Sequence, residues 1–191
     1  MIWFTSDLHF GHSNVLEYEP KRKKILGTTI EQHDQALIDR INSKVKSTDT
    51  LYLLGDLGMY RHTVQCVKKL NGNKILIRGN HDRESALQLQ AAGILVVAQE
   101  MLIRLGKNKV RLSHFPYRES FIKTAWRHVT GNKLRHYDQR PINDGKWLLH
   151  GHVHGRGTTI PYHNQIHIGV DTHSYLPWSA DEIITIINKE R

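Results

Sequence analysis

The 191-residue sequence has almost no cysteine and no long apolar run. A single residue, Cys66, leaves no intramolecular disulfide and no Cys-x-x-Cys metal or redox site. The longest apolar stretches, such as 94–98, fall well short of the roughly 18 residues that a membrane-spanning helix needs. The first residues reach Asp7 before a signal-peptide core could form. We therefore expect a cytoplasmic protein without membrane contacts.

Acidic residues are scarce beside basic ones, since 18 Asp and Glu stand against 27 Lys and Arg and give a formal net charge of +9. Such a balance favours polyanionic partners. Histidine is abundant, with 14 residues, so a metal site in this chain would use nitrogen and oxygen ligands rather than thiolates. The length and the 39% hydrophobic content are typical of one soluble globular domain, which we expect to span residues 1–191.

Apolar patterning alternates between strand and helix in the first half of the chain. Short apolar runs predict strands, and apolar residues at helical spacing predict helices, in the order β, α, β, α, β that is typical of an α/β sheet. These elements are expected at 2–5, 30–45, 51–54, 61–70 and 74–78. The second half predicts strands at 94–97, 101–105, 110–113, 147–150 and 165–170, and one helix at 179–189 that begins with a Ser179/Glu182 capping box.

Polar side chains able to bind metals follow five of the predicted strands. Ligands of open α/β sheets bind outside the carboxyl ends of the strands, so we expect these five loops to form one crevice. Taken singly, each loop is also compatible with an ordinary turn. The exception is the pair His152 and His154, because alternate residues of an extended segment point to the same side. In chain order the residues are Asp7, His9 and His12; Asp56; Asn80, His81 and Asp82; His114; and His150, His152 and His154.

The sequences and the order of these loops resemble the motifs of the calcineurin-like metallophosphoesterase superfamily. They read Asp7-Leu-His9, Gly55-Asp-Leu-Gly58, Gly79-Asn-His-Asp82, His114 and Gly151-His-Val-His154. The stretch 4–12 is similar to that of small phosphoesterases of bacteria and their phages. The resemblance covers residues 7–154, and it implies an α/β fold, a four-layer α/β/β/α sandwich of two mixed β-sheets flanked by helices.

The resemblance also implies a site for two divalent cations, with Mn²⁺ expected first and Fe, Zn or Ni as alternatives. Asp56 would bridge the two cations, which a carboxylate can span when they lie about 3.5–4 Å apart. The implied nucleophile is a hydroxide that bridges both cations and attacks phosphorus in line. Of the remaining ligands, Asp7, His9 and His154 would hold one cation, and Asn80, His114 and His152 would hold the other.

His81 is left over among the motif residues, and we expect it to face the substrate. There it would stabilise the phosphoryl oxygens or protonate the leaving alkoxide, while Asn80 helps to offset the charge on the transferring group. For three further candidate site residues, an ordinary structural role is an alternative to a functional one. His12 would line the pocket or be an exposed loop residue, and Asp82 would orient a neighbouring histidine or be an ordinary turn residue. Asp171 would border the site or lie on a surface loop.

The span 115–146 has no clear periodicity and is longer than in the simplest family members. Its cations and aromatic residues suit a nucleotide or single-stranded nucleic acid, with charges for the phosphates and rings for base stacking. The alternative is a solvated basic loop anchored by its aromatics. We treat the span as an insertion or cap that sets specificity, with Arg118 as a candidate substrate-binding residue. The run Lys21-Arg-Lys-Lys24 predicts a solvated surface, with phosphate steering as the alternative.

Three functions remain open at this stage. The leading hypothesis is a metal-dependent phosphodiesterase or phosphatase that acts on a nucleotide or another phosphate ester. A nuclease or nucleic-acid end-processing phosphatase is favoured by the charge of +9 and by the basic insertion. A catalytically silent binding module of the same fold is the third hypothesis, and the presence of every implied ligand and of His81 weighs against it.

Overall fold

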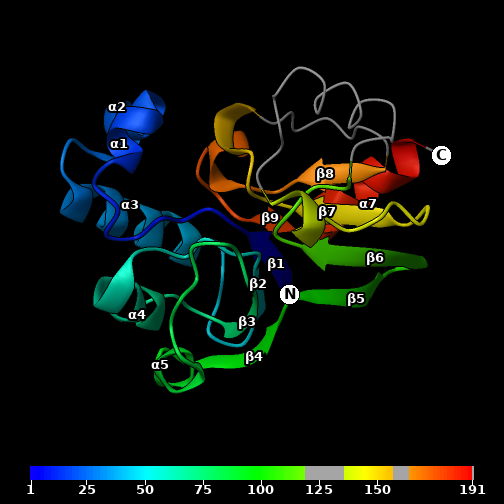
Figure 1. Cartoon of the computed structure of the whole chain (residues 1–191), viewed down its shortest axis with the longest axis horizontal. Helices are drawn as coiled ribbons and strands as arrows, with labels where there is room; N and C mark the ends of the chain where they lie inside the picture. The colour runs from blue at the N-terminus through cyan, green and yellow to red at the C-terminus, as the bar shows by residue number, and fades with distance from the viewer. Residues whose placement is uncertain (119–135, 157–163, 191) are drawn as a thin grey trace.

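The computed structural model describes residues 1–118, 136–156 and 164–190, which form two β-sheets (Figure 1). The larger sheet has the strand order β4-β3-β2-β1-β9, in which β1 to β4 run parallel and β9 pairs antiparallel with β1. Its strands are β1 (Ile2–Thr5), β2 (Thr50–Leu53), β3 (Asn73–Ile77), β4 (Ile94–Ala98) and β9 (Trp178–Ser179).

The smaller sheet has the order β5-β6-β7-β8, with β5 and β6 antiparallel and the other pairs parallel. Its strands are β5 (Glu100–Leu105), β6 (Asn108–Ser113), β7 (Trp147–His150) and β8 (Gln165–His167). Both sheets are therefore mixed, and with their flanking helices they confirm the expected metallophosphatase fold class.

Helices flank the larger sheet on the side away from the smaller one, where α3 (Ile30–Asn42), α4 (Tyr60–Lys68) and α5 (Ala86–Ala91) lie in Figure 1. Two short helices, α1 (Val15–Tyr18) and α2 (Pro20–Leu26), precede α3, and α7 (Ala180–Lys189) ends the described chain. The predicted capping box at Ser179 and Glu182 is confirmed, and Thr29 with Gln32 forms another at the start of α3. Among the described residues, no helix has the length and apolar character needed to cross a membrane.

Two apolar clusters form the core. In the first, Leu37 and Ile41 of α3 and Val67 of α4 pack with Leu51 and Leu76 of the larger sheet. The second joins the two sheets and α7, and it includes Phe4, Leu54, Ile77, Leu112, Leu149, Ile183 and Ile187. Because β1 and β3 contribute to both clusters, the larger sheet is covered on both faces, which explains the continuous apolar runs seen in its strands.

The predicted strands and long helices are confirmed, with differences at their ends and four omissions. The strand expected over 165–170 stops at His167, because Val170–Thr172 forms a 3₁₀ turn instead. Helices α1, α2 and α5 and the two-residue strand β9 were not predicted. These elements are too short for apolar periodicity to be recognised in the sequence.

Backbone hydrogen bonds join the loops that follow the strands of both sheets. The amide of Asp7 donates to the carbonyl of Gly55 at 3.0 Å, which continues the pairing of β1 and β2 beyond the strands. Ser6, directly after β1, forms a bridge with Gly169, which follows β8, and Gly151 donates to the carbonyl of His114 at 3.0 Å. The carboxyl ends of the two sheets therefore meet in one region.

Most of the predicted insertion at 115–146 lies outside the described residues, since 119–135 are not among them. The described parts begin with Phe115 and Tyr117, which are buried. The Arg118 guanidinium donates to the carbonyls of Arg140 and Asp138, at 2.8 and 3.0 Å. Arg118 therefore joins the two described ends of the insertion.

Candidate active site

Side chains from the loops after β1 and β7 form a first cluster of potential ligand atoms. The Nε2 atoms of His9 and His154 lie 3.1 Å apart, and His154 Nε2 is 3.9 Å from Asp7 Oδ1. The ligand atoms of all three residues lie within 4.8 Å of one another. Asp7 and His9 are buried and His154 is half-buried, so the cluster is open to the pocket on the His154 side.

A second cluster lies beside the first and is built from the loops after β2, β3, β6 and β7. His114 Nε2 is 3.2 Å from both Asn80 Oδ1 and His152 Nδ1, and 3.4 Å from Asp56 Oδ2. Asp56 Oδ2 is also 3.9 Å from Nε2 of His9 in the first cluster. The Asp56 carboxylate thus stands between the two clusters.

The donor atoms fit divalent cations. His114 donates from Nδ1 to the carbonyl of Leu54 at 2.8 Å, so in the neutral ring its Nε2 lone pair faces Asn80 Oδ1 and Asp56. Such acceptors repel one another at this distance unless a proton or a cation lies between them. Imidazole nitrogen, amide oxygen and carboxylate oxygen without thiolate are a ligand set suited to Mn²⁺, Fe or Zn²⁺.

The pKa values reflect this crowding. Burial raises the pKa of Asp7, and burial together with the charge of Arg22 holds the pKa of His9 well below its ordinary value. Burial alone would lower the pKa of His114, but its contact with Asp56 raises it to about 9. Burial, aided by the neighbouring His114 charge, lowers the pKa of His152 to about 3. Without a cation, a proton on His114 therefore balances the Asp56 carboxylate.

Close backbone approaches explain the glycines of the motifs. A Cβ atom on Gly79 would lie 2.3 Å from Asp56 Oδ1, and a Cβ atom on Gly151 would lie 2.4 Å from Asp7 Oδ2. Real Cβ atoms do not approach other atoms so closely. Glycine at these positions lets the loops reach the two carboxylates.

Asp82 acts on the backbone rather than on a histidine. Its carboxylate accepts hydrogen bonds from the amides of Gly79, Asp56 and Leu57, at 2.7, 3.0 and 2.8 Å. The contacts of the Asp82 carboxylate in the described residues are with these three amides, which is the second of the two alternatives that the sequence offered, a residue that shapes a turn. Asp82 thereby fixes the turn that carries Asp56.

A buried arginine that the sequence pattern did not reveal supports the first cluster. Arg22 of α2 has 0% exposure, pairs with Asp171 through Nε and Nη2 at 2.7 and 2.6 Å, and donates to the Asp7 carbonyl at 2.7 Å. Asp171 in turn lies 3.2 Å from Nδ1 of His154, which leaves Nε2 of that ring to face His9. The prediction of a solvated surface fails at Arg22, while the three lysines of the same run are exposed.

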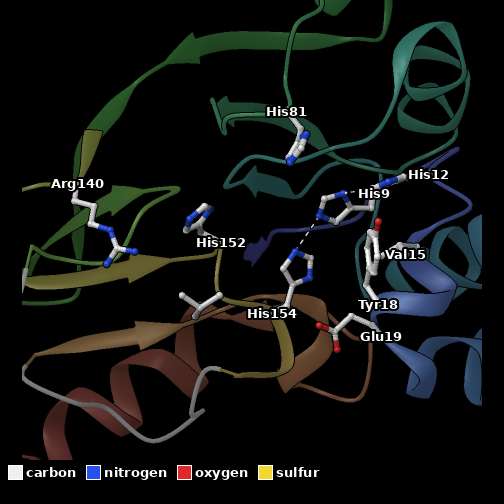
Figure 2. Close-up of a pocket in the computed structure, with 10 residues that line it drawn as sticks. His9, His12, Val15, Tyr18, Glu19, His81, Arg140, His152 and His154 are labelled. Carbon is white, nitrogen blue, oxygen red and sulfur yellow. Dashed lines mark hydrogen bonds between the residues drawn. The ribbon is translucent and has the colours of Figure 1, made fainter. Parts of the chain in front are cut away.

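A cavity of about 600 Å³ opens over the two clusters (Figure 2). His81 stands at its upper side in this view, with its ring centroid 5.7 Å from that of His9 and its amide donating to Asp56 Oδ1 at 3.0 Å. The cavity is lined by His9, His12, Val15, Tyr18, Glu19, His81, Arg140, His152, Val153 and His154.

Some predicted residues line this cavity and others do not. His12 does, with its Nδ1 atom 3.4 Å from that of His9. Arg118 is not among the described lining residues, so its proposed substrate contact has no support, and Arg140 from the same segment lines the cavity in its place. His150 stacks on His167 with ring centroids 5.2 Å apart, outside both clusters.

Comparison with known proteins gives a consistent result. The family model of calcineurin-like phosphoesterases matches residues 1–184. The Gene 66 proteins of Mycobacterium phages L5 and D29 are each 33% identical over 208 residues; the alignments cover 97% and 98% of this chain and 93% and 96% of theirs. A solved structure of a protein of unknown function from Aquifex aeolicus has a TM-score of 0.66 at 24% identity, covering 97% of this chain and 98% of that one. This last likeness shows a shared fold.

Proposed function

The chain belongs to the calcineurin-like phosphoesterase family, and from this premise we propose that it is a metal-dependent phosphodiesterase acting on nucleotides or similar phosphate esters. The observation that carries the proposal is the pair of adjoining ligand clusters with Asp56 between them. Two cations close together suit in-line displacement at phosphorus, because they stabilise both the attacking and the leaving oxygen.

In this proposal each cluster holds one divalent cation. Bound there, the cations would activate a water molecule and neutralise charge on the phosphoryl group. Mn²⁺ is our first choice because the resemblance to the phosphoesterase family implies it, while the mixed imidazole, carboxylate and amide ligands suit Fe or Zn²⁺ as well. Asp7, His9 and His154 are assigned to one cation, Asn80, His114 and His152 to the other, and Asp56 to both.

Three residues, His81, Arg140 and Asn80, are proposed to act on the substrate. His81 is held by its amide at Asp56 and stands in the cavity beside the clusters, which supports a role in giving a proton to the leaving oxygen. Arg140 adds positive charge to the cavity wall and favours an anionic substrate. Asn80, through its amide group, helps to offset charge on the transferring group.

The size of the cavity favours a small ester. About 600 Å³ is in the range of pockets that take small-molecule ligands, and one nucleotide fits it. A nuclease or end-processing phosphatase remains the second candidate, because the net charge of +9 favours a polyanion. Cleavage of single-stranded DNA that weakens steeply with rising salt would favour this second candidate.

The test compares a diester with a monoester. Metal-stripped protein with Mn²⁺ added back is assayed on bis-p-nitrophenyl phosphate and p-nitrophenyl phosphate, beside His81→Asn, Asp56→Asn and a control, His62→Asn, at an exposed histidine outside the cavity. We expect metal-dependent diester cleavage, with His81→Asn lowering kcat roughly 10²–10⁴-fold.

Metal content separates the roles of the two variants. We expect His81→Asn to keep both cations, whereas Asp56→Asn binds them weakly because the shared carboxylate is gone. A preference for the monoester would make the protein a phosphatase. No turnover of either ester with two cations bound would overturn the proposal and favour the binding module.

A further inference from the structure

One wall of the cavity takes no part in the proposed chemistry. It is formed by α1 and the residues around it, namely His12, Val15, Tyr18 and Glu19. Val15 is buried, but Tyr18 is 70% exposed although it lines the cavity. Figure 2 shows the Tyr18 ring beside Val15 and between His12 and Glu19. An aromatic face so exposed in a cavity offers a surface on which a flat ring can stack.

The local backbone holds this wall in place. Helix α1 ends at Tyr18 and is capped by Glu19, whose amide donates to the carbonyl of Val15, and Pro20 begins α2 at the next residue. Proline fixes its own φ and disfavours the helical conformation for the residue before it, and Glu19 leaves that conformation with φ −124° and ψ 76°. The break between the helices therefore fixes the backbone from which Tyr18 and Glu19 reach the cavity.

The two flanks of the cavity carry opposite charges. Arg140 lies on the far side of His152, and Glu19 lies beyond His154 (Figure 2). The Glu19 carboxylate also approaches the backbone of Gly155, where an added Cβ would be 3.0 Å from Glu19 Oε2. An ionised carboxylate only accepts hydrogen bonds. The α1 side thus disfavours a second phosphate and favours a ring that carries N–H groups.

We propose that the α1 wall is a nucleobase subsite, in which Tyr18 stacks on the base and Glu19 accepts hydrogen bonds from its N–H groups. This inference rests on the proposed function, whose substrate it specifies. Guanine presents two adjacent donors, its ring N–H and its amino group, and these match the two oxygens of one carboxylate. Adenine and cytosine present an amino donor beside an acceptor, and uracil presents one ring N–H between two carbonyls. The subsite therefore selects guanine.

The test measures binding by calorimetry on the full chain, with GMP, AMP, CMP, UMP and inorganic phosphate as probes. The measurements use the His81→Asn background with Mn²⁺, in which turnover is expected to be slow. We expect GMP to bind at least tenfold more tightly than phosphate and tightest of the four nucleotides. Tyr18→Leu should bring GMP close to phosphate, whereas Tyr18→Phe should keep the difference because it keeps the ring.

Glu19→Gln tests the base preference. We expect it to weaken GMP binding about tenfold and to leave AMP within a factor of two. Glu17→Gln is the matched control, since Glu17 lies on α1, pairs with Lys23 at 3.0 Å and does not line the cavity. Short single strands ending in G or A form a second arm, and a Tyr18→Leu effect on these strands alone would assign the same subsite to a strand end.

The proposal is overturned if GMP and phosphate bind equally, or if Tyr18→Leu leaves their ratio unchanged for both mononucleotides and strands. Hydrolysis of bis-p-nitrophenyl phosphate distinguishes this failure from failure of the proposed function. If that diester is still cleaved by the parent protein, the phosphodiesterase assignment stands and the nucleobase subsite alone is rejected.

Discussion

Most residues of the two clusters have a backbone conformation that is rare for residues other than glycine. Asp7, His9, Asp56, His152 and His154 all have left-handed φ angles, between 47° and 73°. For residues other than glycine this conformation costs about 1–2 kcal/mol each. It also turns each loop sharply at the strand end. The surrounding hydrogen bonds, from Arg22 and Asp82 in particular, hold these residues in that conformation.

Substitution of Arg22 tests whether its hydrogen bonds hold the ligand residues in place. We expect Arg22→Met to weaken cation binding at the Asp7, His9 and His154 cluster roughly 10–100-fold, because the groups that orient metal ligands contribute about that much. The second cluster keeps its cation, so titration calorimetry with Mn²⁺ should resolve one tight site instead of two. Lys23→Met is the control, since Lys23 is an exposed neighbour in α2.

A folding defect would obscure this result, so Asp171→Asn is measured in parallel. It keeps Arg22 and removes the charge that faces His154 Nδ1 and the guanidinium. The same selective loss of one site is expected. Wild-type affinity at both sites in either folded variant would contradict the positioning role.

The contrast between Arg22 and the strand-end residues shows what the sequence reveals at this scale. Asp7 and His9 were predicted to lie together because their motif follows a recognisable strand. Arg22 lies in a run of cations, and its burial depends on Asp171, which is 149 residues further along the chain. Local pattern carries no information about such a partner.

At the scale of elements, the turns after β2 and β3 must nearly touch. A Cβ atom on Gly79 would lie 2.6 Å from the Asp56 amide nitrogen as well as 2.3 Å from its Oδ1 atom. We expect Gly79→Ala to separate the two turns, to lower Tm by roughly 5 °C or more, and to abolish cation binding at the Asn80 and His114 cluster. Circular dichroism and Mn²⁺ titration measure the two effects.

Gly145→Ala is the matched control for this prediction. Gly145 has a φ of +81°, but nothing lies within 4 Å of the position of its Cβ atom. The substitution therefore costs only the left-handed backbone, roughly 1–2 kcal/mol, and leaves metal binding intact. Equal effects of the two substitutions would mean that close approach at Gly79 is unimportant.

Strand pairing is the part of the fold that the sequence could not supply. The runs 94–97 and 101–105 were both recognised as strands, and their short separation suits a hairpin. In the structure β4 pairs parallel with β3 in one sheet, and β5 pairs antiparallel with β6 in the other. Apolar pattern specifies which face of a strand is buried, but not the strand beside which it lies.

For the whole molecule, charge is distributed unevenly between surface and site. The chain carries a net charge of +9, yet the buried residues Asp7, Asp56 and Asp82, and Asp171 with its 3% exposed side chain, gather around the two clusters. Each lies next to a compensating histidine, arginine or set of backbone amides. The charge state of the folded protein is therefore linked to the occupancy of the site.

This linkage predicts how stability depends on pH. Contact with Asp56 outweighs burial and raises the pKa of His114 from 6.5 to about 9 in the folded, metal-free protein. A raised pKa stabilises the fold fully below pH 6.5, and the stabilisation is lost as the pH rises through 9. In EDTA, Tm should fall by several degrees over this range, and Asp56→Asn should flatten the fall because the partner carboxylate is gone.

Divalent cations should counteract the fall of Tm with rising pH. A histidine must be neutral to bind a metal, so Mn²⁺ displaces the proton from His114 and binds more tightly as the pH rises. The increase in Tm on adding Mn²⁺ should therefore grow from pH 6.5 to 9, as expected when a ligand binds only the folded state. Differential scanning calorimetry of the wild type and Asp56→Asn, each with EDTA and with Mn²⁺, makes the comparison. A metal-free Tm that stays constant from pH 6.5 to 9, or an equal slope in Asp56→Asn, would show that the proton and the cation do not compete for the same position.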